Sequence, residues 1–195
     1  MKVVMINMME EGSARTRQKY VRRTYGLLMV LLLMVVIWVL VIWSMSTQSY
    51  QQQNIQPWLH KWSQKMQLGF TLPDVQFTYG EYDYSLKQRP YDFAEFIFRK
   101  SAHLFVYAVL AVLVYGGLKY RRIRSMTCIV AALALVLIIA SIDEYIQQFS
   151  PNRTSSIRDV GVDVLGGCCG IAIYAGLRFL SRKISKRGHS SIHNK

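Results

Sequence analysis

Residues 26–43 read GLLMVLLLMVVIWVLVIW, a run of apolar side chains that contains no charged residue. As an α-helix that rises about 1.5 Å per residue, this run extends about 27 Å and nearly crosses the hydrocarbon core of a bilayer. A cleaved signal peptide has a shorter apolar core and a small-residue cleavage site, whereas the residues from Trp43 onward, WSMSTQSYQQQ, contain no A-x-A pattern. The run therefore predicts an uncleaved transmembrane helix.

Three more apolar segments are long enough to cross a membrane, and they run from Ala94 to Leu118, from Met126 to Phe149 and from Ile157 to Leu180. We therefore predict an all-α fold, an integral membrane bundle of four transmembrane helices. Gly166 and Gly170 lie four residues apart in the last segment and form a small-residue face. Because such faces let helices approach closely, we expect this one to contact the second or the third span.

The composition excludes an ordinary soluble domain, because 52% of the 195 residues are hydrophobic while the formal net charge is +13. The basic residues flank the apolar runs, so we expect membrane lipids and no nucleic acid as partners. Cys128, Cys168 and Cys169 all lie inside apolar segments, where we expect them to pack against helices or to face lipid. No zinc-ligand spacing is present, and we expect neither a metal site nor a cofactor.

Lysines and arginines cluster before the first span, between the second and third spans, and after the fourth. Because basic flanks remain on the cytoplasmic side of a membrane, both termini are predicted to be cytoplasmic. The chain then divides into a cytoplasmic segment at 1–25, a transmembrane domain at 26–180 and a basic cytoplasmic tail at 181–195. The transmembrane domain includes a long outer loop at 44–92.

The outer loop contains the sequence PWLHKWSQKM at residues 57–66. Helical spacing would place Trp58, Leu59, Trp62 and Met66 on one face, which predicts a short helix lying at the membrane surface. A mobile, solvated loop is the alternative interpretation.

Polar residues in the spans are the strongest indication of a site. An ionisable side chain near the centre of a membrane costs about 2.5–3.5 kcal/mol, so such residues usually face the protein interior and have a function. The alternating topology brings the start of the second span, the end of the third and the start of the fourth together at the outer leaflet. The residues that we predict to form a ligand-binding pocket there are Lys100, His103, Tyr107, Asp143, Glu144, Gln147, Arg153, Arg158, Asp159 and Asp163.

Structural explanations remain open for several of these residues. Asp143 and Asp163 are alternatively ion-pair partners of Lys100 or Arg158 that fix the bundle without doing chemistry. Tyr107 is alternatively an aromatic packing residue.

The basic residues at this end suit an anion. Lys100, Arg153, Arg158 and the beginning of the fourth span form a candidate site for a lipid phosphate or a carboxylate. Arg99 lies near a helix end, where we expect its side chain to extend toward the headgroups.

Two stretches of the chain resemble the motifs of VanZ-like membrane proteins. RKSAHLFVYAVLAVL at 99–113 is similar to the first motif, a lysine, a histidine three residues later and a tyrosine on one helix. DEYIQQFSPNRTSSIRDVGVDVLGGCCG at 143–170 is similar to the second. The matching residues are Lys100, His103 and Tyr107 in the first motif, and Asp143, Glu144, Gln147, Arg153, Asp159, Asp163 and Gly166 in the second.

The resemblance covers the four spans and leaves the tails and most of the outer loop unmatched. It implies a multi-pass protein of the bacterial cytoplasmic membrane. It also implies a link to antibiotic resistance, because the founding member is associated with low-level resistance to teicoplanin-type glycopeptides. It supplies no molecular mechanism.

Three functions are compatible with these residues. The first is binding of an anionic lipid-linked group, a cell-wall precursor or a glycopeptide at the outer leaflet. The second is an enzyme that acts on a lipid or headgroup phosphate, in which His103 is the acid or base and Asp143, Glu144 or Asp163 orients it. The third is a structural or assembly subunit. The sequence does not decide whether a reaction occurs, and it leaves the oligomeric state open.

Overall fold

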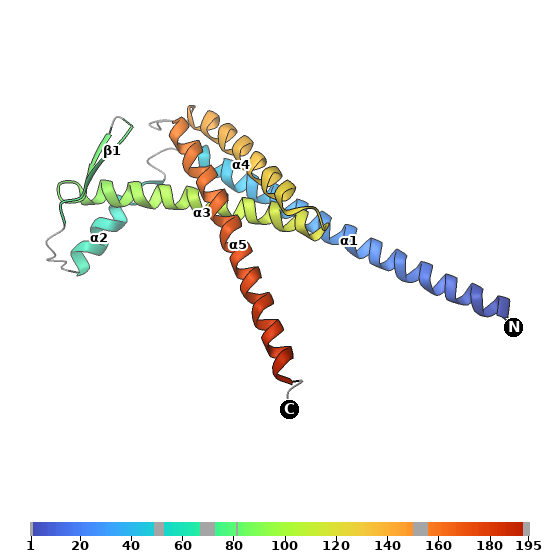
Figure 1. The fold of residues 1–195 in the computed structure, drawn as a ribbon. Helices are drawn as coiled ribbons and strands as arrows, with labels where there is room; N and C mark the ends of the chain where they lie inside the picture. The colour runs from blue at the N-terminus through green and yellow to red at the C-terminus, as the bar shows by residue number, and fades with distance from the viewer. Residues whose placement is uncertain (1, 49–52, 67–72, 81, 150–155, 193–195) are drawn as a thin grey trace.

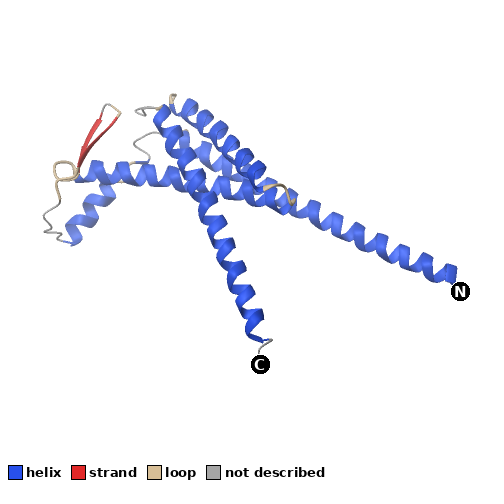
Figure 2. Cartoon of the chain, viewed as in Figure 1, coloured by secondary structure: helices blue, strands red, loops and turns tan. Residues whose placement is uncertain are grey.

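The chain is almost entirely helical in the computed structural model, which describes residues 2–48, 53–66, 73–80, 82–149 and 156–192 (Figure 1 and Figure 2). The elements follow the order α1 (Lys2–Ser46), α2 (Gln56–Met66), β1 (Gln76–Tyr79), β2 (Tyr82–Ser85), α3 (Pro90–Tyr120), α4 (Ser125–Gln147) and α5 (Ile157–Ile192).

Four segments are long and apolar enough to cross a membrane: Thr24–Ser46, Pro90–Tyr120, Ser125–Gln147 and Ile157–Ile184. The predicted four-helix membrane bundle is thus confirmed. The first and last helices are longer than their apolar parts, so the N-terminal part of α1 and the C-terminal part of α5 extend away from the other helices (Figure 1).

Large apolar side chains cover the outside of the bundle. Met29, Leu33 and Leu40 on α1 are each more than half exposed, as are Val130 on α4 and Ile173 on α5. Soluble proteins rarely expose so much contiguous apolar surface, whereas lipid tails solvate it without cost. The exposed surface is that of a multi-pass membrane protein.

The contact between α3 and α5 depends on glycine. A Cβ atom built on Gly166 would lie 2.4 Å from the Leu104 carbonyl oxygen, and one built on Gly170 would lie 2.5 Å from the Ala108 carbonyl oxygen. The two helices therefore touch through their backbones, and α5 presents its small-residue face to the second span as predicted. The pairing of Leu104 with Gly166 and of Ala108 with Gly170 shows that α3 and α5 run in the same direction.

Small side chains also form the contacts of α4 with the other helices. Cys128, Ala132 and Ala140 are completely buried, and a Cβ on Gly167 of α5 would lie 3.3 Å from Leu133. The free thiol of Cys128 is thus a packing group, while Cys168 is exposed and Cys169 is half-buried.

On the other side of α3, Trp38 of α1 donates its indole N–H to the Val106 carbonyl oxygen at 2.9 Å.

The loop at 44–92, which is predicted to lie outside, contains more structure than its sequence pattern indicates. The predicted short helix is present as α2, and it is followed by an antiparallel hairpin in which Gln76 pairs with Ser85 and Tyr79 pairs with Tyr82. Gly80 has φ +67°, a conformation that glycine adopts without strain, and this allows the tight turn. The hairpin packs through Phe77 and Tyr84 onto the aromatic rings of Phe93 and Phe96 at the start of α3.

Candidate functional site

The polar residues of the spans meet at one end of the bundle, which is formed by the middle of α3, the first turns of α5 and the last turns of α1 and α4. We call this the polar end. The connections make α3 and α5 begin there and α4 finish there, so residues more than a hundred positions apart become neighbours.

His103 of α3, Asp143 of α4 and Asp163 of α5 form the centre of the polar end, and we call them the three-helix cluster. Each can present one ring nitrogen or carboxylate oxygen so that these atoms all lie within 4.8 Å of one another. His103 Nδ1 lies 3.2 Å from Asp163 Oδ1. Asp143 is 1% exposed and Asp163 is fully buried, so both carboxyl groups are removed from solvent.

Asp143 is held in place by two neighbours. The Ser46 hydroxyl of α1 donates to Asp143 Oδ1, and the Gln147 amide donates to Asp143 Oδ2 at 3.0 Å from one turn further along α4. Asp143 and Gln147 therefore share one face of α4. Ser46 was not among the predicted site residues, although its place in the Ser- and Gln-rich segment after the first span was a signal for it.

Lys100 occupies the rim of the polar end. Its ammonium group pairs with Asp159 of α5, and the Tyr79 hydroxyl donates to the same Asp159 oxygen at 2.5 Å. The ammonium nitrogen also lies 4.6 Å from the centre of the Tyr79 ring, a distance that suits a cation–π contact. Burial, followed by the Asp159 carboxylate, raises the pKa of the Tyr79 phenol above its usual value.

Arg99 lies on the side of α3 that faces α1. Its guanidinium group is 3.5 Å from Glu95, which is almost completely buried. The Gln56 amide of α2 donates to Glu95 and to Asp92 at 2.7 Å each, and thereby joins the outer-loop helix to α3. Glu95 and Gln56 were not among the predicted site residues, because a carboxylate near a helix start is usually solvated.

The remaining predicted residues lie at the junction of α4 and α5. Glu144 accepts a hydrogen bond from the backbone N–H of Ser156 at 3.0 Å and so fixes the beginning of α5. Arg158 is exposed at the start of α5. Arg153 lies outside the described residues.

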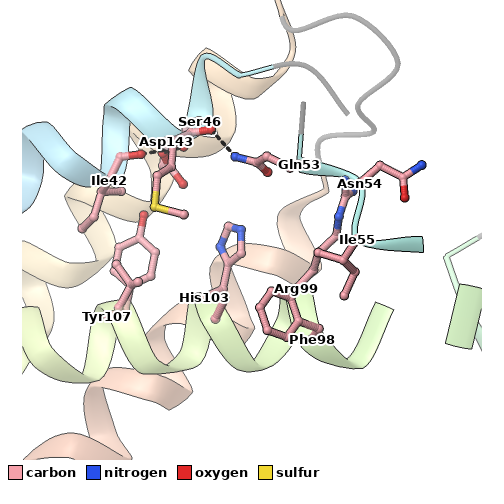
Figure 3. Close-up of a pocket in the computed structure, with 13 residues that line it drawn as sticks. Ile42, Ser46, Gln53, Asn54, Ile55, Phe98, Arg99, His103, Tyr107 and Asp143 are labelled. Atoms are coloured by element: carbon pink, nitrogen blue, oxygen red, sulfur yellow. Dashed lines mark hydrogen bonds between the residues drawn. The ribbon is translucent and has the colours of Figure 1, made fainter. Parts of the chain in front are cut away.

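A cavity of about 320 Å³ opens beside the three-helix cluster. His103, Arg99, Tyr107 and Asp143 supply its polar wall, and Figure 3 shows the first three in a row along α3, with the Tyr107 hydroxyl pointing toward Asp143. The other side chains and segments that line it are Ile42, Met45, Ser46, Gln53, Asn54, Ile55, Phe98, Ala102 and Val106. The cavity therefore combines charged and hydrogen-bonding groups, which include both the Arg99 guanidinium and the Asp143 carboxylate, with apolar side chains.

The structure brings together most of the predicted site residues, with pairings that the sequence left open. Lys100 pairs with Asp159 instead of Asp143 or Asp163. Of the predicted residues, His103, Tyr107 and Asp143 line the cavity, and Asp163 lies directly behind His103. Arg99, which we expected to extend toward the headgroups, lines the cavity as well.

A family model described as VanZ/LLP1 matches residues 30–180 of the chain. The match covers the second and third candidate membrane helices, most of the first and fourth, and every residue of the three-helix cluster. No curated protein and no solved structure matches the chain.

Proposed function

The chain belongs to the VanZ/LLP1 family, and from this premise we propose that it acts in the bacterial cell envelope by binding the anionic head of a lipid-linked molecule. The observation that supports the proposal is the cavity at the polar end, whose lining combines a guanidinium, an imidazole, a phenol and a carboxylate with apolar side chains. An amphiphile has the same division into a polar head and an apolar chain.

The polar wall suits a phosphate or a carboxylate. A guanidinium group binds either anion through two parallel hydrogen bonds, and Arg99 is positioned to do so from α3. His103 and Tyr107 add further hydrogen-bond donors on the same helix. A volume of about 320 Å³ accommodates a headgroup and the first part of a chain, and the apolar side chains Ile42, Met45 and Phe98 would cover that part.

The basic flanks orient this cavity in the proposal. With both termini in the cytoplasm, the polar end faces the outer leaflet, where lipid-linked cell-wall precursors are used and glycopeptides act. Binding there would change how a teicoplanin-type glycopeptide reaches its target. This provides a physical route from the cavity to the resistance associated with the family.

The test compares drug susceptibility with lipid retention in the same set of variants. We expect Lys100→Ala, Asp143→Asn and Arg153→Ala to abolish the change in teicoplanin susceptibility that the wild-type chain gives to a host, with membrane insertion unchanged. Arg99→Ala should in addition reduce the anionic lipid that mass spectrometry detects on the protein purified in mild detergent. Arg121→Ala is the matched control, because Arg121 is exposed at the opposite end of α3.

If wild type and Arg99→Ala retained the same amount of anionic lipid, the binding proposal would be overturned. If all four variants, Lys100→Ala, Asp143→Asn, Arg153→Ala and Arg99→Ala, failed to insert or fold while Arg121→Ala behaved normally, the polar end would be a structural element, and an assembly subunit would be the better interpretation.

An enzyme is the second candidate, and the contact between His103 and Asp163 favours it. A carboxylate 3.2 Å from Nδ1 fixes the orientation of an imidazole ring, and His103 lines the cavity where a phosphate would be placed. His103→Asn separates the two functions. An enzyme would lose turnover of a lipid phosphate and keep lipid binding, whereas a binding protein has no turnover to lose.

A further inference from the structure

We propose that the three-helix cluster, His103, Asp143 and Asp163, holds a single divalent transition-metal ion. The inference goes beyond the proposed function and does not depend on it, because a metal site at this position can exist whether or not the cavity binds a lipid. The three donors come from α3, α4 and α5, so no ligand spacing along the sequence indicates the site.

The positions of the donors suit a metal ion. One nitrogen or oxygen from each residue lies within 4.8 Å of the other two, and the closest pair is 3.2 Å apart. Zn²⁺ binds nitrogen and carboxylate oxygen at about 2.0–2.2 Å, which places neighbouring ligand atoms about 3–3.5 Å from each other. The pair from His103 and Asp163 already has this spacing. The Asp143 ligand atom lies within 4.8 Å of both, so the third donor is close to the same point.

The charges at the polar end leave the cluster negative. Asp143 and Asp163 are buried, while two cations in the described part of this end contact other carboxylates: Lys100 pairs with Asp159, and Arg99 lies against Glu95. Even a protonated His103 would neutralise one of two carboxylates. Because an uncompensated charge buried away from water is strongly unfavourable, a divalent cation is the natural counter-ion for this set.

Asp163 provides an independent observation. Its Oδ2 atom is buried and has no hydrogen-bond partner within the described part of the chain, although the residue is completely enclosed. A carboxylate oxygen in this position is available to coordinate a cation. Asp143 keeps coordinating capacity too, since each carboxylate oxygen has a second lone pair beside the hydrogen bonds from Ser46 and Gln147.

The surroundings are those of a metal site that is open on one side. The hydrogen bonds from Ser46 and Gln147 fix the orientation of Asp143, as outer hydrogen bonds do for carboxylates that ligate metals. His103 and Asp143 both line the cavity, so a bound ion would have an unfilled coordination position toward it. One imidazole with two carboxylates favours Zn²⁺ or Mn²⁺ over Mg²⁺ and Ca²⁺, which prefer oxygen ligands throughout.

The experiment measures metal on the full-length protein in detergent. Wild type, Asp163→Asn, His103→Asn and the control Asp92→Asn are treated with EDTA, equilibrated separately with Zn²⁺ and Mn²⁺, and analysed for bound metal by mass spectrometry and, for Mn²⁺, by electron paramagnetic resonance. Asp92→Asn removes one acid from the same end of α3 and keeps an oxygen that can accept the Gln56 hydrogen bond. Monodispersity on a sizing column reports folding.

We expect a single ion per chain in wild type and in Asp92→Asn. In Asp163→Asn and His103→Asn the affinity for the metal ion should fall by about 10- to 100-fold or more. Removal of a residue that only hydrogen-bonds to a metal ligand already causes a loss of that size. Wild type without bound Zn²⁺ or Mn²⁺ would overturn the proposal, and this result needs no variant. Equal binding by wild type and both cluster variants would also overturn it, since the ion would then lie elsewhere.

Discussion

Substitution of Gly166 by alanine is the smallest change that tests how the bundle is held together. The added Cβ atom would lie 2.4 Å from the Leu104 carbonyl oxygen and 2.9 Å from its Cα atom, whereas an ordinary contact is 3.4–4 Å. Both neighbours are backbone atoms, so no side chain can rotate out of the way. The contact between α3 and α5 would have to widen by about the missing distance.

The size of the effect follows from two opposing contributions. Overpacking of a well-packed contact costs about 1–3 kcal/mol. The change from glycine to alanine inside a helix contributes about 0.8–1 kcal/mol in the stabilising direction. Gly161→Ala carries only the second contribution, because Gly161 lies on the same helix and a Cβ built on it meets no atom within 4 Å. The difference in stability between the two variants therefore measures the overpacking. We therefore expect Gly166→Ala to be less stable than Gly161→Ala by about 1–3 kcal/mol.

The assay is unfolding of the purified protein by SDS titration in mixed micelles, followed by circular dichroism for both variants and wild type. Gly161→Ala should be as stable as wild type or more stable. If Gly166→Ala matched Gly161→Ala, the backbone contact between α3 and α5 would be wrong. The alignment of His103 with Asp163, which depends on the same helix contact, would then lose its support.

Three further predictions concern single side chains and the orientation of the chain. Ser46→Ala removes the hydroxyl that donates to buried Asp143 and should lower the free energy of unfolding by about 1.5–3 kcal/mol, whereas Ser44→Ala on the exposed side of α1 should change little; similar effects in both variants would contradict this role. The pKa of Tyr79 is raised above its ordinary value of 10.0, so the phenol should stay protonated at pH 11 in the folded protein. In the unfolded chain the same phenol ionises at pH 11. The stability that this group contributes is therefore lost as the pH rises above 10.0. Wild type and Tyr79→Phe should consequently show the same phenolate absorbance at that pH, and a surplus in wild type would refute the burial of the hydroxyl beside Asp159. Reporter fusions should place Tyr82 outside the cell and Arg122 in the cytoplasm, and an external signal at Arg122 would reverse the proposed orientation.

The sequence by itself determined the class of fold. Four apolar runs of bilayer length leave helices as the only way to satisfy the backbone in lipid, and this holds regardless of how the helices pack. The same logic located the polar end: an even alternation of spans must bring the starts of α3 and α5 to the end of α4. His103, Asp143 and Asp163 were therefore predictable as neighbours from residue type and topology.

The hairpin at 76–85 was not predicted, although its signals are present in the sequence. Tyr and Phe alternate with polar residues around Gly80, which is a pattern typical of a hairpin. Strands of four residues are too short to be stable alone, and this pair is held by aromatic contacts with Phe93 and Phe96. The stabilising partner is part of a different element, so local sequence carries little information about it.

Only the tertiary structure decided which polar groups pair. Helical spacing indicates that Lys100 and His103 share a face, but it does not indicate the register of the opposite helix. That register is set where Leu104 meets Gly166 and Ala108 meets Gly170, and it follows that Lys100 meets Asp159 and His103 meets Asp163. The roles of Ser46 and Arg99 also depend on where α1 lies against α3. Contacts between helices are set by the shape of their surfaces over several turns, and this information is distributed over residues too far apart for any local pattern to reveal.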